Sequence, residues 1–171
     1  MPAIDRYTGV LYDALDADTL SDSARHRAGT QLRVHSALFG LVGGLDPIPA
    51  YRLSHDSRLP DLRLGEHWRA AIASELAAHD GLIVDLRSEG YAELGRLPRR
   101  PEAVYLRVLS AGPTGEVRAL NHFNKKAKGA FARALLDAET SPISVDELLS
   151  WADSSGFQLR AGTPGELELL V

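Results

Sequence analysis

Lysine is confined to one short stretch of this chain of 171 residues. The three lysines are Lys125, Lys126 and Lys128, whereas sixteen arginines are spread along the sequence. An ammonium is a compact, strongly hydrated point charge and a guanidinium is planar and always charged, so the two are not interchangeable. The lysines, with Arg133 close behind them, are therefore predicted to bind an anion. The alternative is a solvated helix face whose charge serves solubility.

The basic charge is concentrated around these lysines. Residues 91–135 carry a net charge of +6, the remainder carries −10, and the whole chain carries −4. An acidic protein with one basic segment is suited to bind an anion at that segment. It is poorly suited to coat nucleic acid with its whole surface.

Polar groups that could bind a ligand lie in a glycine-broken loop. Residues 40–51 include three glycines and two prolines, and Asp46, Tyr51 and Arg52 lie within seven residues of one another. Arg52 could bind a carboxylate or phosphate, Tyr51 could stack or donate its hydroxyl, and Asp46 could orient one of them. The alternative is an internal Asp46–Arg52 pair that only fixes the loop.

A second group of polar residues follows a predicted buried strand. Ser88 and Tyr91 come shortly after residues 82–86, and ligands usually sit at the carboxyl ends of strands in parallel sheets. Both residues are therefore candidates for a pocket. The alternative is that Ser88 caps the next helix and Tyr91 packs in the core.

The sequence lacks the residues that several common catalytic and binding sites require. The chain has no cysteine, so it has no disulfide and no thiolate site. Phosphate-loop, dinucleotide-binding, nucleophile-elbow and zinc-protease motifs are missing. The six histidines have no spacing that aims two rings at one metal, so we predict no metal and no cofactor. No apolar run reaches the length of a membrane span and no signal pattern opens the sequence, so we predict a cytoplasmic protein without membrane contact.

Helix and strand patterns alternate along the chain. This predicts an α/β (or α+β) protein with one domain over residues 1–171 and a mixed sheet flanked by helices. Helices are predicted over residues 9–20, 22–31, 66–79, 88–97, 124–139 and 144–153. Strands are predicted over residues 32–38, 82–86, 103–109, 116–123, 157–160 and 166–170. The stretch 40–51 is too broken for a regular element, and a tight turn is predicted at residues 113–115.

The predicted helix over residues 124–139 carries the lysines. Its apolar stripe, which is expected to pack on the sheet, consists of Ala127, Phe131, Ala134 and Leu135. At 100° per residue, Lys125 points away from that stripe, and Lys126 and Lys128 fall on its flanks. Gly129 is placed near Lys125 on the outward face, where core packing does not require it. A glycine there would let a ligand or another backbone approach closely.

Several short motifs follow one another in a fixed order. They are Ser36-x-Leu38-Phe39-Gly40-Leu41, Leu45-Asp46-x-Ile48-x-x-Tyr51-Arg52-Leu53, Trp68, Leu86-x-Ser88-x-x-Tyr91, and Lys125-Lys126-Ala127-Lys128-Gly129 with Arg133. This ordered set resembles the YaaA peroxide-stress proteins, a bacterial family long described as of unknown function. The family's usual Arg-Pro and Tyr are replaced here by Gly43-Gly44 and Phe39. The family's N-terminal third has no counterpart, so we expect one YaaA-like domain that is N-terminally incomplete.

The resemblance implies a role in the response to hydrogen peroxide, with protection of DNA from iron-driven oxidation. It also implies non-specific DNA binding through a basic cleft, for which the candidates are Lys125, Lys126, Lys128, Arg133 and Arg52. A second hypothesis is an enzyme or small-ligand binder that takes an anionic metabolite or nucleotide, with pocket candidates Asp46, Tyr51, Ser88 and Tyr91 beside Lys125. Whether a reaction is catalysed stays open. Because loss of a strand exposes a sheet edge, a homodimer through that edge is a further expectation.

Overall fold

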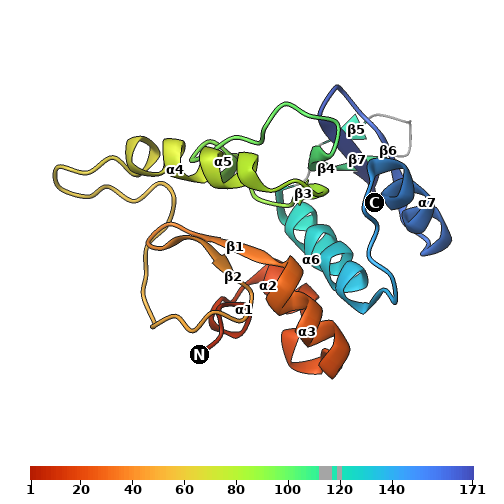
Figure 1. Ribbon diagram of the computed structural model, residues 1–171, viewed down its shortest axis with the longest axis horizontal. Helices are drawn as coiled ribbons and strands as arrows, with labels where there is room; N and C mark the ends of the chain where they lie inside the picture. The colour runs from red at the N-terminus through yellow and green to blue at the C-terminus, as the bar shows by residue number, and fades with distance from the viewer. Residues whose placement is uncertain (112–116, 119–120) are drawn as a thin grey trace. The chain divides into compact units, whose positions relative to one another are not determined.

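The computed structural model describes residues 1–111, 117–118 and 121–171 (Figure 1). The chain forms two units. The first consists of Met1–Tyr7, His26–Asp80 and Arg87–Pro98. The second consists of Thr8–Arg25, Gly81–Leu86 and Arg99–Val171. No helix in the described ranges is both long and apolar enough to cross a membrane.

The first unit is organised around a β-hairpin. Strands β1 (Arg33–Ser36) and β2 (Gly40–Gly43) are antiparallel, with Ser36 opposite Gly40. The prediction of no regular element over residues 40–51 is wrong for β2, because pairing with β1 outweighs the low strand propensity of its glycines. The helices of this unit are α1 (Ala3–Arg6), most of α3 (Asp22–Gln31), α4 (Leu64–Ala78) and α5 (Glu89–Ala92).

The core of the first unit lies beneath the hairpin turn. Ala37, Leu64 and Leu94 are buried there, and partly buried apolar and aromatic residues surround them. These surrounding residues are Leu53, Leu59, Trp68 and Tyr91. The helix α4 was predicted from the four-residue recurrence of Trp68 and Ile72, and both residues lie in the helix as expected. The hairpin turn between β1 and β2 therefore includes Ala37, which is fixed in this core.

The second unit contains the mixed sheet that the α/β prediction requires. Its strand order is β3-β4-β7-β6, with β5 also paired to β4. The strands are β3 (Ile83–Asp85), β4 (Ala103–Ala111), β5 (Val117–Arg118), β6 (Gln158–Ala161) and β7 (Glu166–Leu170). The pairs β3–β4 and β4–β7 are parallel, and the pairs β6–β7 and β4–β5 are antiparallel. The α/β class with a mixed sheet is confirmed.

The predicted strand over residues 116–123 is mostly wrong. Only Val117–Arg118 form a strand, and the helix α6 (Asn121–Asp137) already begins at Asn121. The tight turn predicted at residues 113–115 lies outside the described residues. Within the path of described strands, β3 and β6 are the outer members. The homodimer expected through an exposed edge stays a prediction, as does the single domain.

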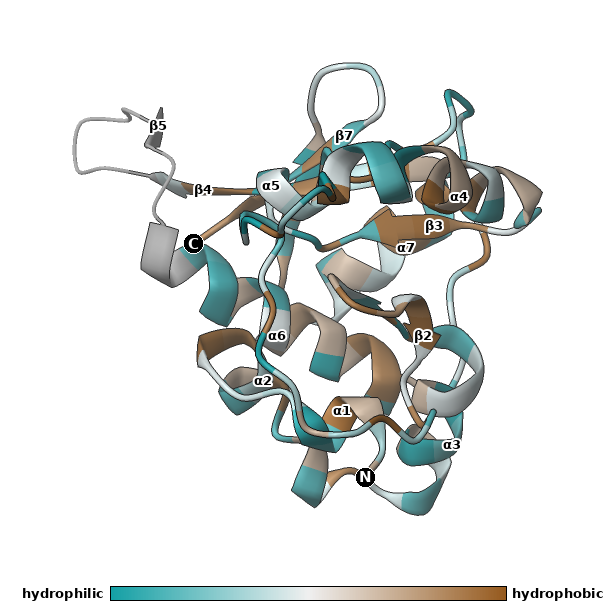
Figure 2. Cartoon of the chain, turned by 90° about the vertical axis from the view of Figure 1, so that its left-hand side faces the viewer, coloured by the Kyte–Doolittle hydropathy of each residue, from teal (hydrophilic) through white to brown (hydrophobic). Residues whose placement is uncertain are grey.

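Alternate residues give the strands of this sheet one apolar and one charged face. Leu106 pairs with Leu167 and Val108 with Leu169, all at most 2% exposed, and they pack with Phe131 of α6 and Leu148 of α7 (Val145–Ser154). The intervening positions carry Arg107, Arg160, Glu166 and Glu168. In Figure 2, β3 is mostly hydrophobic, whereas hydrophilic and hydrophobic residues follow one another along α6.

A glycine sets the distance between α6 and the helix α2 (Val10–Leu15), which lies beside it (Figure 1). A Cβ atom at Gly129 would collide with the carbonyl oxygen of Leu11 and lie 2.9 Å from the Cβ of Ala14. Gly129 is buried, so the predicted outward, uncrowded placement is wrong. The predicted close approach of another backbone is what the glycine permits.

We expect Gly129→Ala to destabilise the protein by about 2 kcal/mol, since overpacking a filled interface costs about 1–3 kcal/mol. Denaturant unfolding measures this change. The matched control is Gly65→Ala in α4, where the nearest side-chain atom lies 3.8 Å from the added Cβ. That control should be neutral or slightly stabilising, because alanine is the better helix former. Equal midpoints for wild type and Gly129→Ala would contradict the packing account.

Candidate functional site

The hydroxyl of Ser36 closes the hairpin turn between β1 and β2. Ser36 is fully buried, and its Oγ accepts hydrogen bonds from the backbone N–H groups of Leu38 at 3.1 Å and Phe39 at 2.9 Å. These two bonds occupy both acceptor positions of the hydroxyl. Its own proton is therefore left to donate to another group.

That group is a tyrosine hydroxyl. The hydroxyl of Tyr51 lies 2.6 Å from Ser36 Oγ and also contacts the hydroxyl of Tyr7, which lies 44 positions away in sequence. Burial raises the pKa of Tyr7 well above its ordinary value, and hydrogen bonding with Ser36 partly opposes that shift. Three hydroxyls from three separate segments thus form one connected group, here called the hydroxyl chain (Tyr7, Ser36, Tyr51).

An indole fixes the same turn from the other side. Trp68 Nε1 donates a 2.8 Å hydrogen bond to the carbonyl of Ala37. Gly40 then leaves the turn with φ of +76°, and a Cβ atom there would lie 2.9 Å from the Trp68 ring. Position 40 therefore needs glycine both for its backbone angle and for the close indole.

Tyr91 lies between two imidazoles. Its ring meets those of His35 and His55 edge-on, at centroid distances of 5.3 and 5.0 Å. Burial raises the pKa of Tyr91, with a further contribution from Tyr51. Arg87 lies 3.0 Å from His35 Nδ1 and donates to the carbonyl of Gly95 at 2.8 Å.

The other predicted pocket residues have simpler roles. Asp46 accepts a 2.7 Å hydrogen bond from the Gly43 N–H and so holds the turn after β2, instead of pairing with Arg52. Ser88 is the N-cap residue of α5, but its exposed side chain makes no capping hydrogen bond. Arg52 is exposed and forms no hydrogen bond or ion pair with the described residues. Of the pocket candidates, Tyr51 and Tyr91 are close enough for Tyr51 to contribute to the raised pKa of Tyr91.

The three lysines fall into two environments in the second unit. Lys125 and Lys126 are exposed on α6, as predicted for Lys125. Lys128 is only 3% exposed, and its ammonium lies 4.5 Å from the centroid of the Tyr105 ring and 3.4 Å from the Tyr105 hydroxyl. A cation over an aromatic face is stabilised without an external anion. Lys128 thus packs against Tyr105 of the sheet, and its predicted role in anion binding stays a prediction.

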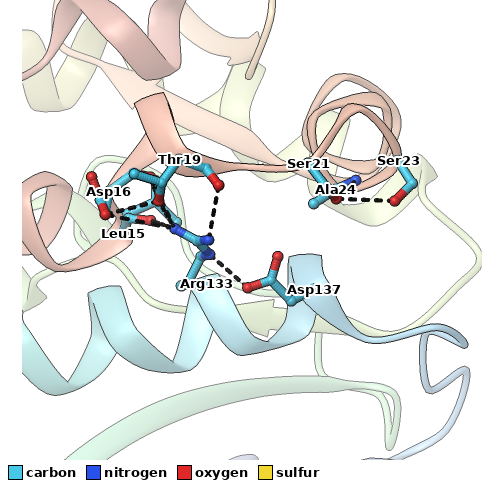
Figure 3. A network of polar contacts seen from close by, with 8 residues as sticks. All are labelled: Leu15, Asp16, Thr19, Ser21, Ser23, Ala24, Arg133 and Asp137. Carbon is cyan, nitrogen blue, oxygen red and sulfur yellow. Dashed lines mark hydrogen bonds and ion pairs between the residues drawn. The ribbon is translucent and has the colours of Figure 1, made fainter.

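Arg133 also serves the structure of the second unit (Figure 3). Its guanidinium donates to the Asp16 carbonyl at 3.0 Å, the Thr19 hydroxyl at 2.7 Å and the Asp137 carboxylate at 2.6 Å. Asp16 ends α2 in the left-handed conformation, with φ of +50°. A cation at a helix C-terminus satisfies carbonyls that have no partner within the helix. Arg133 therefore acts as a clamp on this end of α2, and its predicted role in anion binding stays a prediction.

Comparison of the sequence with known proteins relates this chain to one family. A family model described as "Peroxide stress protein YaaA" matches residues 1–162. The chain belongs to this family. A UPF0246 protein of Corynebacterium glutamicum strain R is 43% identical over 177 residues, which cover 100% of this chain and 69% of that protein.

UPF0246 proteins of other bacteria are similar to the chain as well. A UPF0246 protein of Streptomyces coelicolor is 44% identical over 183 residues, covering 99% of this chain and 68% of its own. A UPF0246 protein of Shewanella piezotolerans is 32% identical over 163 residues, covering 91% of this chain and 62% of its own. This member of the YaaA family therefore spans roughly two thirds of the length of these relatives.

Two members of the hydroxyl chain were missed as site residues in this YaaA-family sequence. Ser36 carried a signal, because a serine in a predicted buried strand must find hydrogen-bond partners. Tyr7 carried none, because nothing local connects it to Tyr51. His35 and His55 were set aside with the other histidines, since their contact with Tyr91 exists only in the fold.

The raised pKa of Tyr7 predicts a loss of stability at alkaline pH. Below the unfolded pKa, about 10 for tyrosine, both states are protonated and the stability is intact. As pH rises further, the unfolded state ionises first, so the free energy of unfolding falls. Tyr7→Phe should fall less steeply between pH 9 and 11, as measured by urea unfolding at each pH. Identical slopes for the two proteins would contradict the assignment.

Replacing the Arg133 clamp should destabilise the second unit. We expect Arg133→Ala to cost about 2 kcal/mol, because several partly buried groups lose a charged donor. Arg133→Lys should recover only part of this loss, since an ammonium cannot reach all the partners at once. The control is Arg96→Ala, which removes an exposed pair with Glu93 at 2.9 Å and should cost about 0.5 kcal/mol or less. Equal effects of Arg133→Ala and Arg96→Ala would refute the clamp.

Proposed function

We propose that this YaaA-family protein acts in the response to peroxide by binding DNA without sequence preference. In this proposal Lys125 and Lys126 of the second unit contact phosphates, and Arg52 of the first unit does so separately. Such contacts fix the position of the protein on DNA but do not read sequence. Binding of this kind depends strongly on salt, because each neutralised phosphate releases counterions.

The observation that supports this proposal is the exposure of Lys125 and Lys126 on α6. Neither forms a hydrogen bond or ion pair within the described part of the chain. Most other cations of the basic segment are engaged internally, in pairs such as Arg96 with Glu93 and Arg107 with Glu166 at 2.6 Å. Two adjacent ammonium groups without an internal partner are available for an external anion. Arg99 is also exposed and forms no hydrogen bond or ion pair with the described residues.

The internal pairing also limits the size of the interface. Of the five cations predicted to bind DNA, Lys128 and Arg133 have structural contacts, which leaves three. A protein that neutralises three duplex phosphates has a salt slope of about −3 in a plot of log K against log salt concentration. We therefore propose a few separate phosphate contacts in place of the broad basic cleft that the resemblance implies.

A small anionic ligand, such as a nucleotide, is the second candidate function. The partly exposed side chains of Tyr7 and Tyr51 favour it, because hydroxyl groups held beside a rigid turn can orient a polar ligand. Lys125→Arg separates the two functions. The arginine keeps a phosphate contact and thus DNA binding, but it removes any reaction that needs a lysine amine.

Changing Lys125 and Lys126 together to alanine should weaken duplex binding and reduce the magnitude of its salt slope by about 2. Fluorescence anisotropy of a labelled duplex, titrated at several salt concentrations, gives both quantities. The double arginine variant should bind as wild type does, because it keeps both charges. Arg96→Ala is the control for a cation already paired. Unchanged affinity in the alanine variant would overturn the proposed contact.

A further inference from the structure

The hairpin turn of the first unit presents two large apolar side chains outward. Leu38 is 44% exposed and Phe39 is 39% exposed, whereas the adjacent Ala37 is 1% exposed. Exposing an aromatic ring and a leucine side by side costs hydration free energy. The exposure of both side chains is therefore typical of a surface that binds a ligand or partner.

The turn is held rigidly in this exposed form. Ser36 Oγ binds the N–H groups of both Leu38 and Phe39, and Trp68 binds the carbonyl of Ala37. The hydroxyl chain in turn fixes Ser36 through Tyr51. Such preorganisation lowers the entropy lost when the turn binds a partner.

The ring of Phe39 is itself oriented. It meets the Tyr51 ring edge-on, at a centroid distance of 5.4 Å and an interplanar angle of 81°. Tyr51 is followed directly by Arg52, whose exposed guanidinium has no hydrogen bond or ion pair with the described residues. An oriented aromatic ring and an available cation in the same unit are the two kinds of group that bind a base and a phosphate of single-stranded nucleic acid.

We propose that the Leu38–Phe39 turn is a stacking contact for an unpaired nucleobase, with Arg52 on the neighbouring phosphate. This rests on the proposed DNA binding and adds a preference to it: single-stranded or unpaired segments over perfect duplex. A base offers its π-face only where it is not stacked between neighbours, and stacking on an aromatic side chain tolerates any base.

The size of the patch favours a base over a protein partner. A stable protein interface buries about 800 Å² on each side, from some twenty to thirty residues. Two adjacent side chains at a hairpin tip provide far less. One exposed ring is sufficient for one base.

The test compares Phe39→Leu with Phe39→Tyr in binding a labelled single-stranded oligonucleotide and the matching duplex. Leucine keeps the apolar bulk and removes the π-face, whereas tyrosine keeps the ring. We expect Phe39→Leu to bind the single strand about tenfold more weakly, with Phe39→Tyr close to wild type. The duplex affinity should change little, and the salt slope should be the same in all three proteins, because stacking releases no counterions. Thermal unfolding of each variant verifies the fold.

The outcomes separate this inference from the proposed function. If wild type binds neither nucleic acid at low salt, both are overturned. If wild type binds with a salt slope that depends on Lys125 and Lys126 but Phe39→Leu binds the single strand equally well, only the stacking contact is overturned. If Phe39→Leu instead changes self-association alone, the turn belongs to a contact between copies of the chain and the inference is wrong.

Discussion

A buried hydroxyl that must satisfy its hydrogen bonds organises the first unit. Ser36 has no access to water, so its three hydrogen-bonding positions are filled by two backbone N–H groups and a tyrosine hydroxyl. Leaving any of these groups unpaired in the interior would cost about 1–3 kcal/mol. The turn geometry, the position of Tyr51 and the contact with Tyr7 all follow from this one requirement. The exposed ring of Phe39 is held in place as a consequence.

A different constraint governs the second unit, because most of its basic side chains in the described residues contact carboxylates, carbonyls or an aromatic ring of the same unit. The basic segment, most of which lies in this unit, has a net charge of +6 in the sequence, but the fold pairs its Arg107 with Glu166 at 2.6 Å. Arg133 is occupied by the end of α2, and Lys128 by the ring of Tyr105. The cations that stay exposed and unpaired are thus few in the described part of this segment. A small contact with phosphates is the interaction that this distribution supports.

Local patterns predicted the elements well but not their partners. The four-residue recurrence in α4 and the apolar run at β3 were sufficient for the α/β class, since both depend on neighbouring residues. Gly129 was placed wrongly because its crowding comes from Leu11, more than a hundred positions away. The structural contacts of Arg133 were not predicted for the same reason, since its partners Asp16 and Thr19 are equally remote. Sequence spacing carries no information about such long-range contacts. Tyr51 and Tyr91 were selected because their own segments had the polar pattern of a site, and their membership of a site stays a prediction.

The most direct test of the account is the affinity of the wild-type chain for a single-stranded oligonucleotide over a range of salt concentrations. The account predicts a shallow slope of about −2, since three phosphate contacts on a single strand contribute about 0.7 each. It also predicts binding that persists on extrapolation to 1 M salt, because stacking does not depend on counterions. A steep slope of −6 or more with no residual binding would indicate a broad basic track without a stacked base. That result would contradict the account.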